Sequence, residues 1–306
     1  MHSETRYAWS GKLDWGKYLR PRHLSEALAL LEEHRGEARI IAGGTDLLIQ
    51  IRKKEAGPRV LVDITRIPDL DRIKFEEGFI KIGALVTHHQ VAVSPLIREK
   101  AGALSQGASR VGSPQIRNLG TVGGNIVSGQ PGADATIPLL ALNAKIRVLS
   151  RKGERMIPLT DLFRGPGKTA VDSASEIVTE VLFPALKEGE TSLSLRLAKR
   201  KALALPILAA SFVLSADLAK KRFHYVNIAL GPVAPVPFRA RKAEQSLAAA
   251  PIREEVIKEA ARKAALESNP RTNPLRGSGA YRKDMVAALV ERGIRQGLQA
   301  LEVQHG

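Results

Sequence analysis

Two short glycine-containing segments carry the residue types best suited to binding a phosphorylated ligand. The first reads IAGGTDLL (41–48) and the second reads IRNLGTVGGN (116–125). Glycine permits positive φ and lets a ligand approach the main chain closely. Consecutive backbone N–H groups can then form a concave anion site, to which neighbouring hydroxyl and amide groups add donors. Either loop alone is ordinary turn chemistry, but the two together predict a clamp around a diphosphate.

Other features that could mark a ligand site fit less well. Gly167-Lys168-Thr169 ends like a nucleotide-binding P-loop, but position 162, where that motif needs glycine, is leucine. No G-x-G-x-x-G occurs, so a Rossmann domain is not supported. His88 and His89 lack further histidines at ligand spacing, so we interpret them as solvated or capping residues rather than metal ligands. The sequence also offers no convincing acid–base pair, and we assign no catalytic residue and no metal ligand.

Composition narrows the kind of protein. The chain of 306 residues contains no cysteine, which excludes disulfides and cysteine-ligated iron–sulfur clusters within it. Its net charge of +16 suggests an anionic partner, such as nucleic acid, a nucleotide cofactor or an acidic subunit. Aromatic residues make up only 4%, which argues against a base-stacking surface. We therefore expect no nucleic-acid binding.

Neither a membrane span nor an export signal is evident. The longest apolar-rich stretch, 203–214, is interrupted by Pro206 and Ser211, and it is shorter than the roughly 20 residues that cross a bilayer. The amino terminus, MHSETRYAWSGKLDWGKY, has no apolar signal core. We expect a cytoplasmic protein without a transmembrane segment.

The first glycine loop is expected between a strand and a helix, and the second within a long irregular segment. Apolar runs predict strands, and Thr45 or Asp46 could cap the helix DLLIQIR. After Thr87, apolar residues at spacings of three and four up to Val111 mark one helical face. Residues 112–136 have little periodicity and many glycines, which indicates a functional loop. The strands are expected at 38–42, 60–64, 79–86, 145–150 and 176–184, and a buried helix at 137–144.

The pattern changes after Pro184. Residues 192–200, 207–218 and 223–233 read as three strands joined by short turns. A proline-rich break (231–238) follows, and apolar periodicity over 252–264 and 285–301 predicts two helices. We therefore expect a second domain with a three-stranded antiparallel sheet followed by helices.

These motifs resemble a known family. AGGTDL, IGALVT and especially IRNLGTVGGNIVSGQPGADATIPLLALNA are similar to the FAD-binding medium subunit of the xanthine dehydrogenase and carbon monoxide dehydrogenase family of molybdenum hydroxylases. The resemblance runs from about residue 14 to the end. It implies an α+β fold, with a two-part FAD-binding domain of the vanillyl-alcohol-oxidase (PCMH) type at 1–188, divided into about 1–58 and 59–188. A domain like the carboxy-terminal domain of the CO dehydrogenase flavoprotein would occupy 192–306.

The resemblance also implies which residues bind FAD noncovalently. The two loops would hold its diphosphate, with Ser128 near the phosphates or ribitol. Asp134 would bond the adenosine portion, and Val111, Val178 and Thr179 would contact the isoalloxazine. Arg196 would lie near the flavin carbonyls, where a cation stabilises reduced flavin. The loop residues are Ile41, Ala42, Gly43, Gly44, Thr45, Asp46 and Leu47 in the first loop, and Thr121, Gly123, Gly124 and Asn125 in the second.

The implied function is electron transfer within an oxidoreductase complex. In the resembled complexes a molybdenum-cofactor large subunit oxidises the substrate, and electrons pass through a small subunit with [2Fe–2S] clusters to FAD and on to a diffusible acceptor. The flavin would perform the redox chemistry, while the protein binds and orients it. Two alternatives stay open: a self-contained flavin reductase or oxidase of the same fold, and a basic binding protein without enzymatic activity. The substrate and the acceptor are not specified by this chain.

Overall fold

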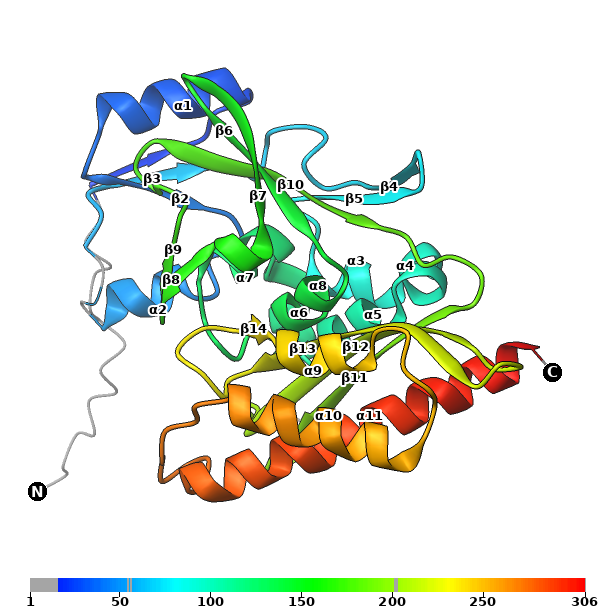
Figure 1. The fold of residues 1–306 in the computed structure, drawn as a ribbon. Coiled ribbons are helices and arrows are strands. Elements are labelled where there is room, and N and C mark those ends of the chain that lie inside the picture. Colours follow the sequence, from blue (N-terminus) through cyan, green and yellow to red (C-terminus); the bar gives the residue numbers. More distant parts are fainter. Residues whose placement is uncertain (1–15, 54, 56, 201–202, 306) are drawn as a thin grey trace, which may run out of the picture.

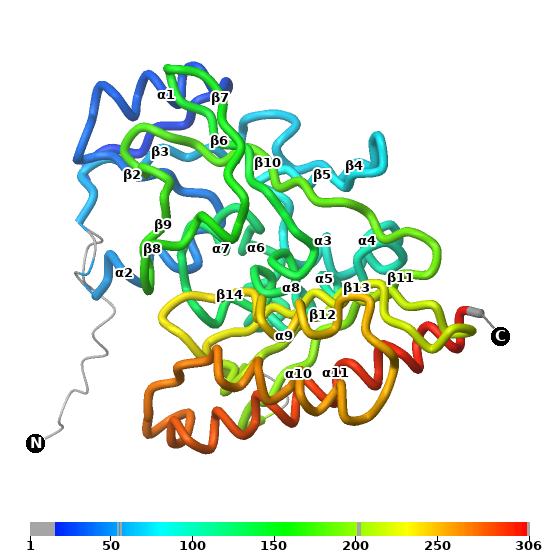
Figure 2. The backbone as a smooth tube through the Cα atoms, viewed as in Figure 1, coloured from blue at the N-terminus to red at the C-terminus, as the bar shows by residue number. Residues whose placement is uncertain are grey.

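A computed structural model describes residues 16–53, 55, 57–200 and 203–305. Figure 1 shows three layers, and the tube in Figure 2 follows the same course. The first layer, a small sheet with α1, lies at the upper left of the view; the middle layer, a larger sheet with short helices below it, lies beside the first; and the last layer, a third sheet with α9, α10 and α11, lies at the bottom. This arrangement confirms the predicted mixed architecture. Residues 1–15, which the sequence analysis places at the start of the FAD-binding domain, lie outside the described residues.

The first layer is built from parallel strands. Its sheet has the order β1-β3-β2, formed by Lys17–Leu19, Val60–Asp63 and Ala38–Ile41. Helix α1 (Leu24–Glu33) buries Ala27, Leu28 and Leu31 against this sheet. All three strands end at one edge, because parallel neighbours run in the same direction. The first glycine loop leaves that edge after β2 and leads into α2 (Leu47–Arg52).

The middle layer contains a five-stranded antiparallel sheet. Its order is β4-β5-β10-β6-β7, and its strands alternate between an apolar and a charged face. Ile80, Ile82 and Val181 face the core, whereas Lys81 and Glu180 face outward. The strands are Ile73–Glu76, Phe79–Gly83, Glu176–Pro184, Lys145–Ser150 and Gly153–Pro158. A single-turn helix, η1 (Leu159–Asp161), and the small hairpin of β8 (Phe163–Gly165) and β9 (Lys168–Thr169) follow β7.

The helices of this layer are shorter than the sequence pattern suggests. The single helix expected after Thr87 is wrong: the chain forms α3 (His88–Val93), α4 (Pro95–Lys100) and α5 (Gly102–Ser109). Pro95 lacks the N–H needed to continue α3, and the Ser94 side chain caps α4 instead. The irregular loop expected at 112–136 is also only partly correct. It contains α6 (Pro114–Leu119) and α7 (Val122–Val127), which are capped by Ser113 and Thr121, and α8 (Thr136–Ala141) follows it.

The last layer confirms the three predicted strands and adds to them. The antiparallel sheet β11-β12-β13-β14 comprises Glu190–Leu197, Leu208–Asp217, Arg222–Gly231 and the two residues Phe238–Arg239. A fourth, very short strand was not expected, because two residues carry no periodicity. Helices α9 (Arg241–Leu247), α10 (Glu254–Glu267) and α11 (Gly279–His305) cover one face (Figure 1). Across the described ranges, no helix, including the 27-residue α11, is long and apolar enough to cross a membrane.

Candidate functional site

The two glycine loops touch each other. A Cβ atom at Gly43 would lie 1.9 Å from the carbonyl oxygen of Leu119, which belongs to the second loop. A Cβ atom at Gly120 would lie 3.5 Å from the hydroxyl of Thr45. The contact at Gly43 leaves no room for a side chain, so this glycine brings together segments that are more than seventy residues apart in the chain.

Backbone hydrogen bonds fix the second loop to the middle sheet. The N–H of His88 donates to the carbonyl of Gly120 at 3.0 Å, and the N–H of Gly123 donates to that of Ala84 at 3.0 Å. The N–H of Ala84 in turn donates to the carbonyl of Thr179 at 3.0 Å. The second loop is therefore bonded to α3 and to the residue after β5, which is itself bonded to β10. These backbone hydrogen bonds fix its position within the chain.

The first loop offers free donors. Within the described part of the chain, the N–H groups of Gly43, Gly44, Thr45, Asp46 and Leu47 have no hydrogen-bond partner. Gly44 has a φ of +68°, which glycine adopts without strain. Asp46 occupies the N-cap position of α2 but makes no capping bond, so the expected cap is absent. A run of unpaired N–H groups in a turn suits an anion such as a diphosphate.

The second loop contributes space rather than donors. Its N–H groups at Gly120, Val122, Gly123 and Asn125 donate to backbone carbonyls, and that of Gly124 donates to the Thr121 hydroxyl at 3.1 Å. The expectation that both loops present free N–H groups is therefore wrong for this one. Gly124 is nevertheless exposed, and a Cβ atom there would meet only the Thr121 hydroxyl, at 3.1 Å. A ligand could approach the backbone at Gly124.

Asp134 and Arg196 form one cluster with Arg110. The Asp134 carboxylate lies 3.5 Å from Nη1 of Arg196, and both side chains are about nine-tenths buried. Arg196 Nη1 also donates to the carbonyl of Arg110, while Arg110 Nη1 donates to the carbonyl of Ser194. The spacing of the sequence gives no sign of Arg110, which meets Arg196 through the packing of α5 on β11 and Asp134 because the same helix packs against the Asp134 backbone at Gly107. The contact places the side chains of Asp134 and Arg196 together, and the adenosine and flavin roles expected for them stay a prediction.

The charges in this cluster are not balanced. Burial raises the pKa of Asp134 to about 6, although Arg196 and Arg110 both act to lower it. The pKa of Arg110 is lowered from its ordinary value, mainly by burial. The charge of Asp134 acts to raise this pKa, and the repulsion of Arg196 acts to lower it further. Two guanidinium groups thus share one carboxyl group, which leaves a net positive charge. Such a cluster can stabilise negative charge on a ligand.

Among the residues that the structure describes, two buried side-chain nitrogen atoms lack hydrogen-bond partners. They are Nε of Arg196 and Nδ1 of His88. His88 is only 2% exposed, and burial, helped by the charge of Arg117, lowers its pKa to about 4. The solvated role expected for His88 is therefore wrong, since the ring packs beside Gly120. An unsatisfied buried polar atom is unusual in a native protein and calls for an explanation, such as a functional role or a bound water molecule.

The remaining expected site residues, Asn125, Ser128 and Val111, differ in their hydrogen bonds and burial. Asn125 accepts a hydrogen bond from the Thr136 hydroxyl at 3.1 Å, and Ser128 donates its proton to the carbonyl of Asn125 at 2.7 Å. Ser128 therefore offers only its lone pairs to a ligand in this conformation. Val111 follows Arg110 directly and is half-buried. These residues surround the second loop and the Asp134 cluster.

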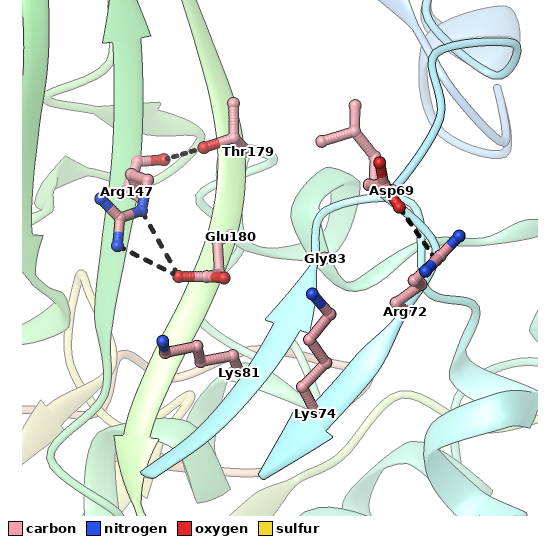
Figure 3. Close-up of a pocket in the computed structure, with 9 residues that line it drawn as sticks. Asp69, Arg72, Lys74, Lys81, Gly83, Arg147, Thr179 and Glu180 are labelled. Atoms are coloured by element: carbon pink, nitrogen blue, oxygen red, sulfur yellow. Dashed lines mark hydrogen bonds and ion pairs between the residues drawn. The ribbon is translucent and has the colours of Figure 1, made fainter. Parts of the chain in front are cut away.

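Val178 and Thr179 do not direct their side chains to the glycine loops. Val178 belongs to the apolar core, and a bulge in β10 turns Thr179 toward the outer face of the sheet. Figure 3 shows Thr179 in a pocket there, with its hydroxyl facing the carbonyl of Arg147. That pocket, of about 190 Å³, is lined by paired charges and lies on the face opposite the core. Contacts of Val178 and Thr179 with a flavin stay a prediction, and their side chains give it no support.

Comparisons with known proteins agree with this geometry. Residues 11–186 match the family described as the FAD binding domain in molybdopterin dehydrogenase, and residues 194–296 match the CO dehydrogenase flavoprotein C-terminal domain. The chain belongs to the molybdopterin dehydrogenase FAD-binding family. Its relatives include the nicotinate dehydrogenase FAD-subunit of Eubacterium barkeri, which is 36% identical over 79% of this chain and 82% of the relative. The carbon monoxide dehydrogenase medium chain of Hydrogenophaga pseudoflava is 30% identical over 91% of this chain and 95% of the relative.

Solved structures show the same fold. Carbon monoxide dehydrogenase from Hydrogenophaga pseudoflava superimposes with a TM-score of 0.88 at 29% identity, covering 93% of this chain and 98% of the other. Quinoline 2-oxidoreductase from Pseudomonas putida 86 gives a TM-score of 0.86 at 27% identity, covering 95% and 99%. The fold expected from the resemblance is thus confirmed over both parts of the chain.

The residues present fit FAD. The first loop supplies unpaired N–H groups for the diphosphate, Gly124 leaves room beside it, and the Arg110–Asp134–Arg196 cluster supplies positive charge. Among the described residues, no group of three or more histidine, aspartate or glutamate side chains could hold a metal ion. The chemistry of this site is therefore that of binding a dinucleotide and tuning its charge.

Proposed function

We propose that this chain binds FAD noncovalently and serves as the electron-transferring flavoprotein subunit of a molybdenum-containing hydroxylase or dehydrogenase. The single observation that carries the proposal is the contact between the two glycine loops, of which the first has five unpaired N–H groups and the second leaves Gly124 open. The family match over residues 11–186 supports FAD as the ligand. When bound, the flavin supplies the capacity to accept and release electrons.

The residues of this chain would bind and tune the cofactor. The N–H groups from Gly43 to Leu47 would hold the diphosphate, and Gly124 would let it approach α7. Arg196, with Arg110, would provide positive charge for the reduced flavin, while Asp134 would limit that charge when it is ionised. Neither general acid nor general base is needed from this chain.

The partners follow from the relatives. Several relatives are named as medium chains or FAD-subunits, which describes one component of a larger assembly. We propose a large subunit with a molybdenum cofactor, a small subunit with [2Fe–2S] clusters and a diffusible electron acceptor. We further propose that the complex is cytoplasmic. We also propose that the chain divides into domains at 1–188 and 192–306, which is supported by one apolar cluster that lies wholly within the second part.

Two measurements test this function. Titration of FAD-stripped protein with FAD should give stoichiometric, noncovalent binding, and affinity purification of the tagged chain from its own cells should recover subunits containing molybdenum and iron. Folded protein that takes up no FAD would refute the cofactor. A flavin-loaded chain that purifies alone and turns over a substrate by itself would instead indicate a self-contained flavoenzyme.

A further inference from the structure

Arg20 lies at the edge of the parallel sheet where the first glycine loop begins. The strand register pairs Ile41 with Asp63 and Leu19 with Val62, and neighbouring strands lie about 4.8 Å apart. The N–H of Ile64 also donates to the carbonyl of Ile41 at 3.2 Å. The ends of β1, β3 and β2 therefore form one continuous edge. In parallel sheets, ligands bind at this carboxyl edge.

Asp63 anchors Arg20 at that edge. Asp63 is only 2% exposed, and its carboxylate accepts hydrogen bonds from Nε of Arg20 at 3.1 Å and from the Tyr18 hydroxyl at 2.9 Å. A third bond comes from the N–H of Thr65 at 2.9 Å. Burial alone would raise the pKa of Asp63, but the bonds from Thr65 and Tyr18 and the charge of Arg20 together lower it. Asp63 is thus a fixed negative charge that orients the arginine.

The outer end of Arg20 is free. Its side chain is 44% exposed, and within the ranges that the structure describes, neither Nη1 nor Nη2 has a hydrogen-bond partner. The Cζ atom of Arg20 lies 6.0 Å from the centroid of the Tyr18 ring, and its two Nη nitrogens keep N–H groups that can donate to a ligand. The planar fork of arginine matches two oxygen atoms of a phosphate group.

A cation beside the first glycine loop would complement the charge of a diphosphate bound there. The unpaired N–H groups of Gly43 to Leu47 are neutral donors, whereas a diphosphate is an anion with two charged groups. We propose that Arg20 is a further FAD-binding residue, which donates its terminal N–H groups to the diphosphate at the first glycine loop, and that Asp63 is its positioning residue. This inference rests on the proposed function of the chain as an FAD-binding subunit.

The test compares ligands with and without a diphosphate. FAD-stripped protein is titrated with FAD, ADP and riboflavin, and its thermal stability is measured in parallel. Arg20→Met should weaken FAD and ADP binding together, by roughly 10- to 100-fold for the loss of one charge-assisted pair, and should leave riboflavin binding unchanged. Arg20→Lys, which keeps the charge beside Asp63 but not the fork, should give a smaller loss. The matched control is Arg22→Met, two residues along the same exposed segment.

The outcomes separate this inference from the proposed function. If Arg20→Met lowers thermal stability but binds FAD and ADP like the wild type, Arg20 is a structural residue and the inference is overturned. Equal losses for riboflavin and ADP would overturn it too, because the effect would not concern the diphosphate. For Asp63→Asn, we expect the same ADP-specific loss. If the folded wild-type protein binds no FAD at all, the proposed function itself fails.

Discussion

Gly124 offers the cleanest perturbation of the cofactor site. It is exposed on the first turn of α7, its φ is not in the left-handed region, and a Cβ atom would meet only the Thr121 hydroxyl, at 3.1 Å. Replacing Gly124 by valine should therefore change the free energy of unfolding of FAD-stripped protein by about 1 kcal/mol or less. The added side chain projects where the diphosphate would approach the backbone.

The expected loss of affinity follows from the contacts displaced. Moving the diphosphate outward by the width of a side chain forfeits at least one charge-assisted hydrogen bond, worth about 1.5–3 kcal/mol. At 1.4 kcal/mol for each tenfold change, the dissociation constant for FAD should rise roughly 10- to 100-fold. The assay is titration of FAD-stripped protein by quenching of flavin fluorescence, with urea unfolding of the same samples.

Two other glycines provide control variants, one for an unaffected site and one for a disrupted fold. Gly57→Val places the same side chain in open space and should bind FAD like the wild type. Gly43→Ala should disrupt the fold itself, because its Cβ would lie 1.9 Å from the Leu119 carbonyl. If Gly124→Val remains folded and binds FAD with wild-type affinity, the diphosphate does not lie at this turn and the reasoning is refuted.

Three further perturbations probe the charges and the domain division. Ionisation of Asp134, with a pKa of about 6 in the fold against 3.8 in the unfolded chain, should destabilise FAD-stripped protein by at most about 3 kcal/mol as pH rises from about 4 to 6. In urea unfolding, Asp134→Asn should abolish this decline, and an unchanged pH slope would contradict it. Arg196→Met should lower the two-electron midpoint potential of the bound flavin by roughly 30–60 mV in spectroelectrochemistry, for about 1.4–3 kcal/mol of lost stabilisation. Arg196→Lys should retain the wild-type potential, and an equal drop in both variants would exclude a charge effect. Gly293→Ala, whose Cβ would lie 2.2 Å from the Phe212 ring, should cost about 1–3 kcal/mol of unfolding free energy without changing FAD affinity, while Gly297→Ala, one turn later, should cost less. A parallel loss of FAD affinity in Gly293→Ala would argue against independent domains.

The strands could be predicted from the sequence because burial imposes a simple pattern on them. Runs such as 60–63 and 208–217 are almost wholly buried, and apolar composition reveals this directly. The helix expected from Thr87 to Val111 failed for the opposite reason. Its apolar spacing is real, but Pro95 interrupts the helix. Three short helices form instead, and they bury most of the apolar residues of the pattern, such as Ile97 and Leu104. Helices of one or two turns depend on capping and tertiary contacts, which periodicity does not report.

The site was predictable only where glycine marks it. The residue types of the two loops indicate close backbone approach, but their contact through Gly43 and Leu119 depends on how two layers pack. Which loop keeps free N–H groups also depends on that packing, since the carbonyls of Ala84 and Val86, just after β5, accept hydrogen bonds from the second loop. Likewise, Arg110 meets Asp134 because α5 packs against the Asp134 backbone.

The most direct test is a crystal structure of the protein with FAD bound. We expect the diphosphate oxygens within hydrogen-bonding distance, about 2.7–3.2 Å, of N–H groups between Gly43 and Leu47, beside the open backbone of Gly124. FAD seated elsewhere, for example in the pocket on the outer face of the sheet in Figure 3, would contradict this site.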